Sequence, residues 1–434
     1  MMRICFPILL GAACAGLLCA QQSATQDSAA APAQVQPEEV TIDQAVREAV
    51  SRNLGLLAER YNLSVAEARI VTARLRPNPV LSVGLDYQDV LGTGFNLRNA
   101  AGPPEANVRV DFVLERGGKR ARRIDVAENG REVARYQLLD ATRSLVLDVQ
   151  SAFVDVLLAK DNLNLARENL KAFESIVEVN SARVKAGDLA KVELVRTRVA
   201  ALQFRNAVRQ AESRVQIARN RLQTLMGRTV FSPLFDVTGT LRRDAETPTL
   251  QGVEEQALKL RPDLIALSRD QARSLAELRL QLAQGKVDYT VGTQYHRQYD
   301  TAHGNAMGFF FSAPLPVFNR NQGEIERARQ EQAQILARIR ALQAEIRSEV
   351  RAAYVQYTTS RDLLHSIETD MLDQARDVRQ TTEYSYRRGE ASFVEFLDAQ
   401  RAFNDTMQSY NEARAEYARS LYVIDSISGK AVNP

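Results

Sequence analysis

Apolar residues recur at alternating intervals of four and three positions through the middle of this 434-residue chain. Such heptad spacing keeps apolar side chains on one face of a helix and is typical of a coiled coil. The positions are Leu145, Val149, Ala152, Val156, Ala159, Leu163, Ala166, Leu170, Phe173, Val177, Asn180 and Val184. The surrounding residues 119–186 contain no proline. At 1.5 Å per residue they would form a helix roughly 100 Å long, so we predict an elongated helical protein.

Two segments of the first half instead alternate between apolar and polar residues with a period of two, which predicts β-strands. In residues 80–90 the apolar positions are Leu81, Val83, Leu85 and Tyr87, and in residues 107–115 they are Val108, Val110, Phe112 and Leu114. The intervening polar positions include Ser82, Asp86, Arg109 and Asp111. Both segments have the length of a membrane-spanning strand.

The second half repeats this order of elements. Residues 56–58 and 83–87 match residues 264–266 and 291–295 at one offset of 208 positions. We therefore predict a second strand pair at 287–295 and 307–312, although the consecutive Phe309, Phe310 and Phe311 weaken the alternation. A repeat of this length indicates a duplicated architecture.

Helices complete each half. We predict a first helix at 41–74, with Thr41 as its N-cap, and helices at 323–387 and 390–426 in the second half. Gly187 and Gly389 would form the tight turns between long helices. The expected organisation is a first repeat at 40–227, a connector at 228–248, a second repeat at 249–428 and a tail at 429–434.

The N-terminus resembles a secretory signal peptide, because Arg3 precedes a mostly apolar run and small residues precede Gln21. We assign residues 1–20 to this signal and residues 21–39 to a disordered leader. All three cysteines lie within residues 1–20, so the mature chain would have no thiol. Lipidation at Cys14 is an open alternative, although the apolar residue usually found three positions upstream is missing.

Composition excludes several functions. The net charge is only +3 among 109 charged residues, and basic and acidic residues are interleaved, which argues against nucleic acid as a partner. The three histidines lack ligand spacing, so we predict no metal site. We also find no catalytic or cofactor-binding motif and expect neither enzyme activity nor a cofactor.

Four strands cannot close a membrane barrel, which needs at least about eight strands without open edges. Three copies would supply twelve strands, and their paired long helices would form a hollow cylinder. We therefore predict a mainly α protein with a small β part: helical hairpins forming a trimeric α-barrel, and a shared 12-stranded transmembrane β-barrel with four strands per chain.

Two local motifs point to a family. Residues 314–325 read PLPVFNRNQGEI, and the predicted tip contains YRRGE at 386–390 and EFLDAQR at 395–401. With the duplication and the order of elements over residues 40–428, they resemble the TolC-like outer-membrane efflux family, in particular the CzcC-like and CusC-like ducts of cation-exporting pumps.

The resemblance implies roles for residues near the two glycine turns. Glu395 and Asp398 would form a ring of carboxylates at the pore constriction, and a contact between Glu193 and Tyr386 would help to hold the gate closed. Gly187 and Gly389 would mark the periplasmic tips, where an adaptor docks. The arginine that the family has two residues after Gly389 is Ala391 here, so Arg387 or Arg388 would have to substitute for it, or the gate contact is weaker.

The implied function is a passive outer-membrane exit duct, extending into the periplasm and exporting heavy-metal cations. Its expected partners are two further copies of the chain, a periplasmic adaptor, an inner-membrane pump of the resistance-nodulation-division type and outer-membrane lipid. The lipid would contact Leu81, Val83, Leu85, Tyr87, Val110 and Phe112. Two alternatives stay open: a duct for drugs or other small molecules, and a non-channel periplasmic coiled-coil adaptor.

Overall fold

The computed structural model describes residues 38–88, 90–92, 104–244, 247–299 and 304–430. The predicted signal peptide and most of the predicted leader lie outside these residues. The helices are α1 Ile42–Arg52, α2 Leu54–Arg74, α3 Lys119–Ala186, α4 Lys191–Leu225, α5 Leu250–Leu260, α6 Pro262–Gln284, α7 Gln322–Ser366, the π-helical turn η1 Ile367–Met371, α8 Leu372–Arg388 and α9 Phe393–Ile427. The strands are β1 Glu38–Val40, β2 Val80–Asp86, β3 Glu105–Leu114, β4 Phe235–Val237, β5 Tyr289–Gln298 and β6 Asn305–Ser312.

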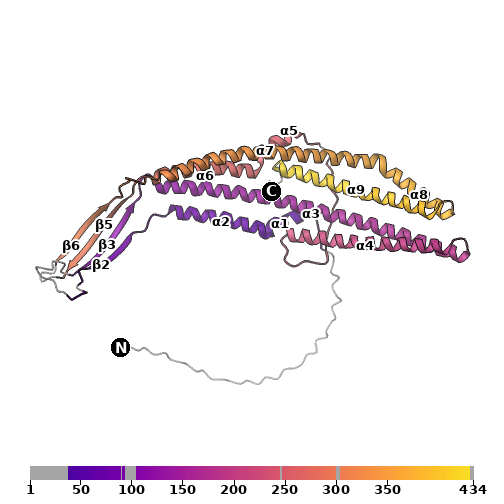
Figure 1. The fold of residues 1–434 in the computed structure, drawn as a ribbon, viewed down its shortest axis with the longest axis horizontal. Helices are drawn as coiled ribbons and strands as arrows, with labels where there is room; N and C mark the ends of the chain where they lie inside the picture. The colour runs from indigo at the N-terminus through magenta and orange to yellow at the C-terminus, as the bar shows by residue number, and fades with distance from the viewer. Residues whose placement is uncertain (1–37, 89, 93–103, 245–246, 300–303, 431–434) are drawn as a thin grey trace, which may run out of the picture. The chain divides into compact units, whose positions relative to one another are not determined.

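The long helix α3 has the predicted ends, and its heptad positions face the interior. Val149, Ala152, Val156, Phe173 and Asn180 are completely buried. The adjacent helix α4 packs along α3 as the second arm of a hairpin (Figure 1). The prediction of a coiled-coil seam in this segment is confirmed.

Two predicted helices are interrupted. The helix expected at 41–74 breaks at Asn53, whose side chain accepts a hydrogen bond from Leu56 N at 3.0 Å and so caps α2. Thr41 caps α1 as expected, in a capping box with Gln44. The helix expected at 323–387 contains η1, one π-helical turn between α7 and α8. Local sequence gives little warning of such a turn, which is stabilised by the tertiary packing of Ile367.

Strands β2, β3, β5 and β6 form one antiparallel sheet in the order β2-β3-β5-β6. This sheet lies at one end of the long helices (Figure 1). The predicted first strand ends early, at Asp86, because Tyr87 adopts a positive φ of 52° that a strand does not allow. Strands β2 and β6 are the two outer strands, and each has one unpaired edge in the described protomer.

A second, two-stranded sheet forms where β1 pairs in parallel with β4 of the connector. Glu38 and Glu39, which fall within the leader predicted from the sequence, instead belong to a strand. Arg228 holds this region by donating hydrogen bonds to the carboxylates of both Glu38 and Glu48 at 2.7–2.9 Å. The hydrogen bonds from Arg228 to Glu38, together with the positive charge of Arg228, outweigh the partial burial of Glu38 and lower its pKa.

No described helix combines the length and the apolar character needed to cross a bilayer.

Candidate pore and gate

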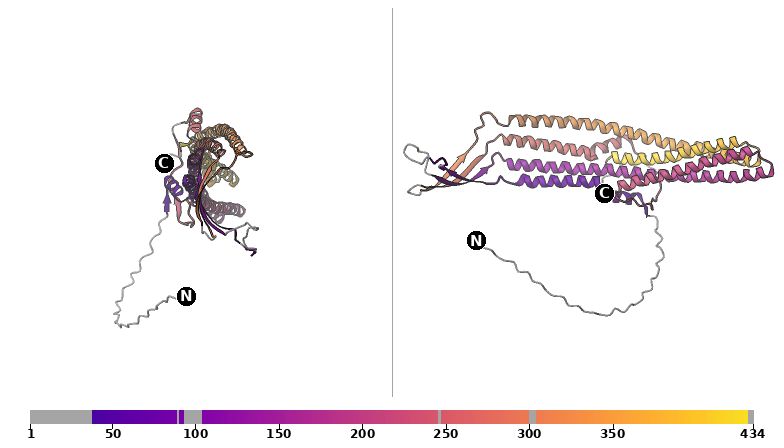
Figure 2. Two further views of the ribbon diagram at one scale, coloured as in Figure 1. Left: turned by 90° about the vertical axis from the view of Figure 1, so that its left-hand side faces the viewer. Right: turned by 60° about the horizontal axis from the view of Figure 1, so that its bottom comes forward.

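The two helical hairpins end in glycine turns at the end opposite the sheet, where they lie side by side (Figure 1 and the right view of Figure 2). Gly187 and Gly389 have φ of 89° and 84°, which is the left-handed conformation that favours glycine after a helix. Both turns therefore have the geometry expected from the sequence.

An aromatic cluster joins the two hairpins just inside the turns. The ring of Phe173 in α3 lies 5.5 Å from that of Phe396 in α9, and Phe396 stacks on Tyr386 of α8 at 5.2 Å. All three side chains are almost completely buried. The tip is thus a packed core to which both repeats contribute.

The expected direct contact between Glu193 and Tyr386 is not made within the protomer. Tyr386 Oη instead accepts a hydrogen bond from Asn180 Nδ2 at 2.7 Å, and Asn180 Nδ2 also donates to Thr197 Oγ1 at 2.8 Å. Thr197 in turn donates to the backbone oxygen of Glu193. The Glu193 carboxylate instead forms an ion pair, at 2.8 Å, with Arg196, which lies one turn further along the same helix.

Glu395 and Asp398 are both exposed near the start of α9. Glu395 also has a structural role, because its carboxylate accepts a hydrogen bond from Ser392 N at 2.7 Å and completes a capping box. This backbone hydrogen bond, with a second one from the Ser392 hydroxyl, lowers the pKa of Glu395, so the side chain is ionised at neutral pH. Asp398 makes no hydrogen bond or ion pair within the described protomer.

The arginines proposed as substitutes at the gate have other contacts. Arg387 pairs with Glu383 at 2.8 Å, and the guanidinium of Arg388 lies 4.6 Å from the ring centroid of Tyr384. Arg183, which sequence analysis missed, donates to the backbone oxygen of Tyr386 at 3.5 Å. Arg183 therefore connects α3 to α8. Its position in the last turn of α3, close to the tip, is the feature of the sequence that could have suggested this contact.

At the other end of the helices, strand pairing sorts the side chains of the sheet into two faces. Residues directly opposite each other in an antiparallel pair share a face. One face is mainly apolar and carries Leu81, Val83, Leu85, Val108, Val110, Phe112, Val291, Tyr295, Met307, Phe309 and Phe311, together with Thr293 and, next to the loops, Arg297 and Asn305. The other carries Ser82, Asp86, Asn107, Arg109, Asp111, Gln294, His296 and Phe310.

The predicted lipid contacts in the strands all lie on the apolar face. Leu81, Val83, Leu85 and Phe112 are exposed, whereas Val110 is half-buried. Tyr87 is exposed but follows the end of β2, so strand pairing does not assign it to a face. The run of three phenylalanines also obeys the alternation, because Phe310 alone is on the polar face.

A polar ladder between α3 and α9 was not predicted. Asn162 pairs with Asn411 at 3.0 Å, and Asn169 contacts both Asn404 at 2.6 Å and Gln400 at 2.9 Å. Asn162 and Asn169 are one heptad apart beside the apolar seam, and this spacing could have revealed the ladder. The two hairpins therefore meet partly through amides rather than through apolar side chains alone.

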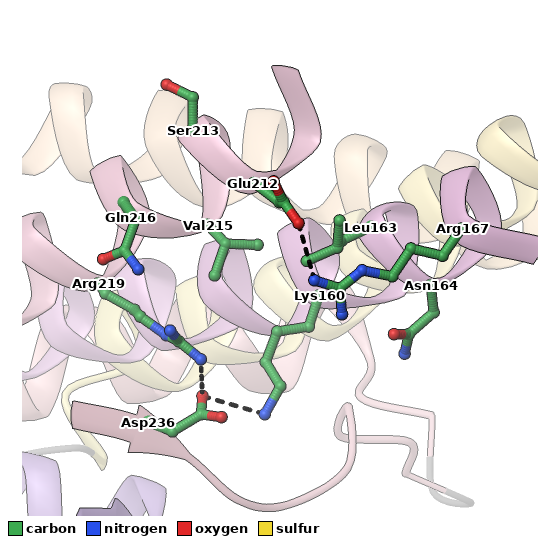
Figure 3. A pocket seen from close by; sticks show the side chains of 10 residues that line it. All are labelled: Lys160, Leu163, Asn164, Arg167, Glu212, Ser213, Val215, Gln216, Arg219 and Asp236. Atoms are coloured by element: carbon green, nitrogen blue, oxygen red, sulfur yellow. Dashed lines mark hydrogen bonds and ion pairs between the residues drawn. The ribbon is translucent and has the colours of Figure 1, made fainter. Parts of the chain in front are cut away.

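A cavity of about 530 Å³ lies between α3, α4 and β4 (Figure 3). Asp236 accepts a hydrogen bond from Lys160 at 3.0 Å and forms an ion pair with Arg219 at 2.8 Å. Burial alone would raise the pKa of Asp236, but its contacts with Arg219 and Lys160 outweigh burial and lower the pKa. These charged side chains therefore hold β4 against the hairpin of α3 and α4. The described residues contain no cluster of His, Cys, Asp and Glu that could hold a metal ion.

Comparison with known proteins gives a consistent result. The family model described as "Outer membrane efflux protein" matches residues 45–228 and 253–430. The chain is 26% identical over 393 residues to the cobalt-zinc-cadmium resistance protein CzcC of Cupriavidus metallidurans, covering 90% of each. It is 24% identical over 385 residues to the pyoverdine export outer membrane protein OpmQ of Pseudomonas putida, covering 83% of this chain and 80% of OpmQ.

Solved structures with the same fold include the outer-membrane channel OprN, with a TM-score of 0.74, 18% identity and 91% of both chains covered. CusC has a TM-score of 0.72 and 17% identity, covering 89% of this chain and 92% of that one. The expected combination of long helical hairpins with a small sheet is therefore confirmed.

Proposed function

The chain belongs to the outer membrane efflux protein family, and from this premise we propose that it is the exit duct of a tripartite system that exports heavy-metal cations. Proteins of this family are outer-membrane channels rather than enzymes. The chain would accordingly conduct passively, and the energy for transport would come from a partner.

The observation that carries this proposal is the two-faced sheet with open edges. An apolar outer face and a polar inner face suit a barrel wall in lipid, but unpaired edges in the bilayer leave backbone groups without hydrogen bonds. Pairing β6 of one protomer with β2 of the next would remove every edge. Three protomers would then form the predicted 12-stranded barrel, with Leu81, Val83, Leu85, Val110 and Phe112 facing lipid.

The proposal of cations as cargo rests on the tip and on the similarity to CzcC. Threefold symmetry would convert Glu395 and Asp398 into six carboxylates around one axis, and rings of carboxylates favour cations in a pore. The lowered pKa of Glu395 favours the charged form of its carboxylate. The similarity to OpmQ supports the alternative, a duct for larger organic molecules.

We further propose that the tips around Gly187 and Gly389 dock a periplasmic adaptor, which connects the duct to an inner-membrane pump of the resistance-nodulation-division type. Docking requires an exposed and repeated surface, and three protomers would present six such turns. A periplasmic adaptor function for this chain is disfavoured by its family and by the amphipathic sheet.

Bilayer recordings of the variant Glu395→Gln/Asp398→Asn test the proposed selectivity. Glutamine can still accept the bond from Ser392 N, so the cap of α9 is kept while the charge is removed. We expect the reversal potential in a salt gradient to show a reduced preference for cations. Asp405→Asn is the matched control, because it removes an exposed charge of α9 about two turns further from the tip.

An unchanged reversal potential in the double variant, with normal assembly, would contradict the selectivity role. If the assembled wild-type oligomer carried no current in a bilayer even when its helical tips were opened, the proposed channel function itself would be wrong.

A further inference from the structure

The glycines of the four-stranded sheet all lie on its polar face. Gly84 pairs with Asn107, Gly292 with Asp111, and Gly308 with Gln294. The apolar face has no glycine in its described strands. Glycine weakens a strand and is found where another group approaches the backbone closely.

Each of these glycines is covered by a larger side chain that lies along the sheet. A Cβ atom added at Gly84 would be 2.7 Å from Asn107 Nδ2, and one at Gly292 would overlap Asp111 Oδ1. At Gly308 the added atom would be 3.4 Å from the ring of Phe310. The side chains of Asn107 and Asp111 thus occupy the space that a Cβ at Gly84 or Gly292 would need, whereas the ring of Phe310 lies at ordinary contact distance above Gly308.

Arg109 connects the side chains of Asp111 and Phe310. Arg109 Nε donates to Asp111 Oδ1 at 2.9 Å, and the Arg109 guanidinium lies 4.5 Å from the ring centroid of Phe310. Phe310 is 38% exposed, against 81% for Phe309 and 66% for Phe311 on the other face. Phe310 therefore lies closer to the sheet than its two neighbours in β6 do.

We propose that Gly84 and Gly292 are positioning residues that keep the outer end of the duct wide. The inference rests on the proposed function, because the polar face borders a lumen only if the sheets close into a barrel. The width of a barrel is set by its strand number, and what remains for cargo depends on how far side chains extend inward. If a side chain at Gly292 pushed the Asp111–Arg109 pair away from the sheet, three such pairs would project into the lumen of a trimer.

A thiol-labelling experiment tests the role of Gly292. Residue 290 lies on the polar face, on the helical side of Gly292 along β5. Reagents entering from the loop end of the sheet must pass Gly292 before they reach Thr290→Cys, and the mature chain is expected to contain no other cysteine. The probes are maleimides carrying polyethylene glycol of graded length, applied to the outside of intact cells.

We expect Gly292→Ala to lower the labelling rate of long reagents relative to short ones several-fold. Thr293→Val, a change at the adjacent position on the apolar face, should leave this ratio unchanged. In an Asp111→Ala background, Gly292→Ala should have a much smaller effect, because no carboxylate is left to displace and only the contact with Val110 O, at 3.0 Å, remains.

An unchanged ratio in Gly292→Ala would overturn the proposal, and an equal drop in the Asp111→Ala background would show that backbone distortion is the cause. If Gly292→Ala fails to yield a heat-resistant oligomer, Gly84→Ala replaces it, since the amide end of Asn107 can shift more easily. Absence of labelling even by the shortest reagent in the Thr290→Cys parent would instead refute the barrel on which the proposal rests.

Discussion

Asn180 connects the two hairpins through a single buried amide. It occupies a position of the apolar heptad seam, is completely buried, and donates to both Tyr386 and Thr197, while its Oδ1 has no partner in the described protomer. A polar residue in such a seam is known to set helix register at a cost in stability. A buried amide of this kind stabilises the closed tip less than an apolar pair would, which suits a contact that has to break when the gate opens.

Tyr386→Phe is therefore expected to favour the open tip. It removes the acceptor for Asn180 and leaves a buried donor unpaired, which costs about 1–3 kcal/mol in the closed state. Single-channel recordings should show a larger open fraction or conductance than wild type. Tyr384→Phe is the control, because Tyr384 is exposed and outside this network. Conductance as low as wild type in Tyr386→Phe would contradict the placement of the gate.

Among the elements, the sheet depends most on its surroundings. Its outer strands are unpaired on one side, and its apolar face is covered by nothing in the described protomer. The helices differ in this respect, because their seams are buried against each other. The sheet is thus the element whose stability is expected to come from lipid and from neighbouring protomers.

Val83→Arg tests the lipid-facing side of β2. If this residue lies near the bilayer midplane, the charge should cost about 2–4 kcal/mol. We expect a lower urea midpoint for unfolding from lipid vesicles. Thr290→Arg on the polar face is the control and should be tolerated, because an aqueous lumen solvates the charge. Equal destabilisation by both substitutions would argue against the assignment of the two faces.

At the scale of the whole molecule, the open strand edges make assembly a requirement for insertion. An isolated protomer would place two unpaired edges in the bilayer. Mass measurement of the purified protein in detergent, after cross-linking, should give three chains. A protomer that inserts alone and forms stable pores would defeat this argument, whatever its cargo.

The sequence alone was sufficient for most elements of the fold. The heptads of α3, the strand alternation and the two glycine turns depend on local periodicity and backbone preference, which one chain segment expresses by itself. The internal duplication was visible for the same reason. The break at Asn53 and the turn η1 were missed because both depend on contacts with distant residues, such as the bond from Asn53 Nδ2 to Leu225 O at 2.9 Å.

The same distinction between local and long-range contacts applies to the candidate site. Sequence placed Glu395, Asp398 and Tyr386 near a tip, because their distance from Gly389 is a local property. Only the tertiary structure showed that Tyr386 contacts Asn180 rather than Glu193. Likewise, only the strand register showed that Gly292 lies opposite Asp111 in the sheet. Partners separated by 206 or 181 positions are chosen by packing and pairing geometry, about which the spacing of residues along one segment carries no information.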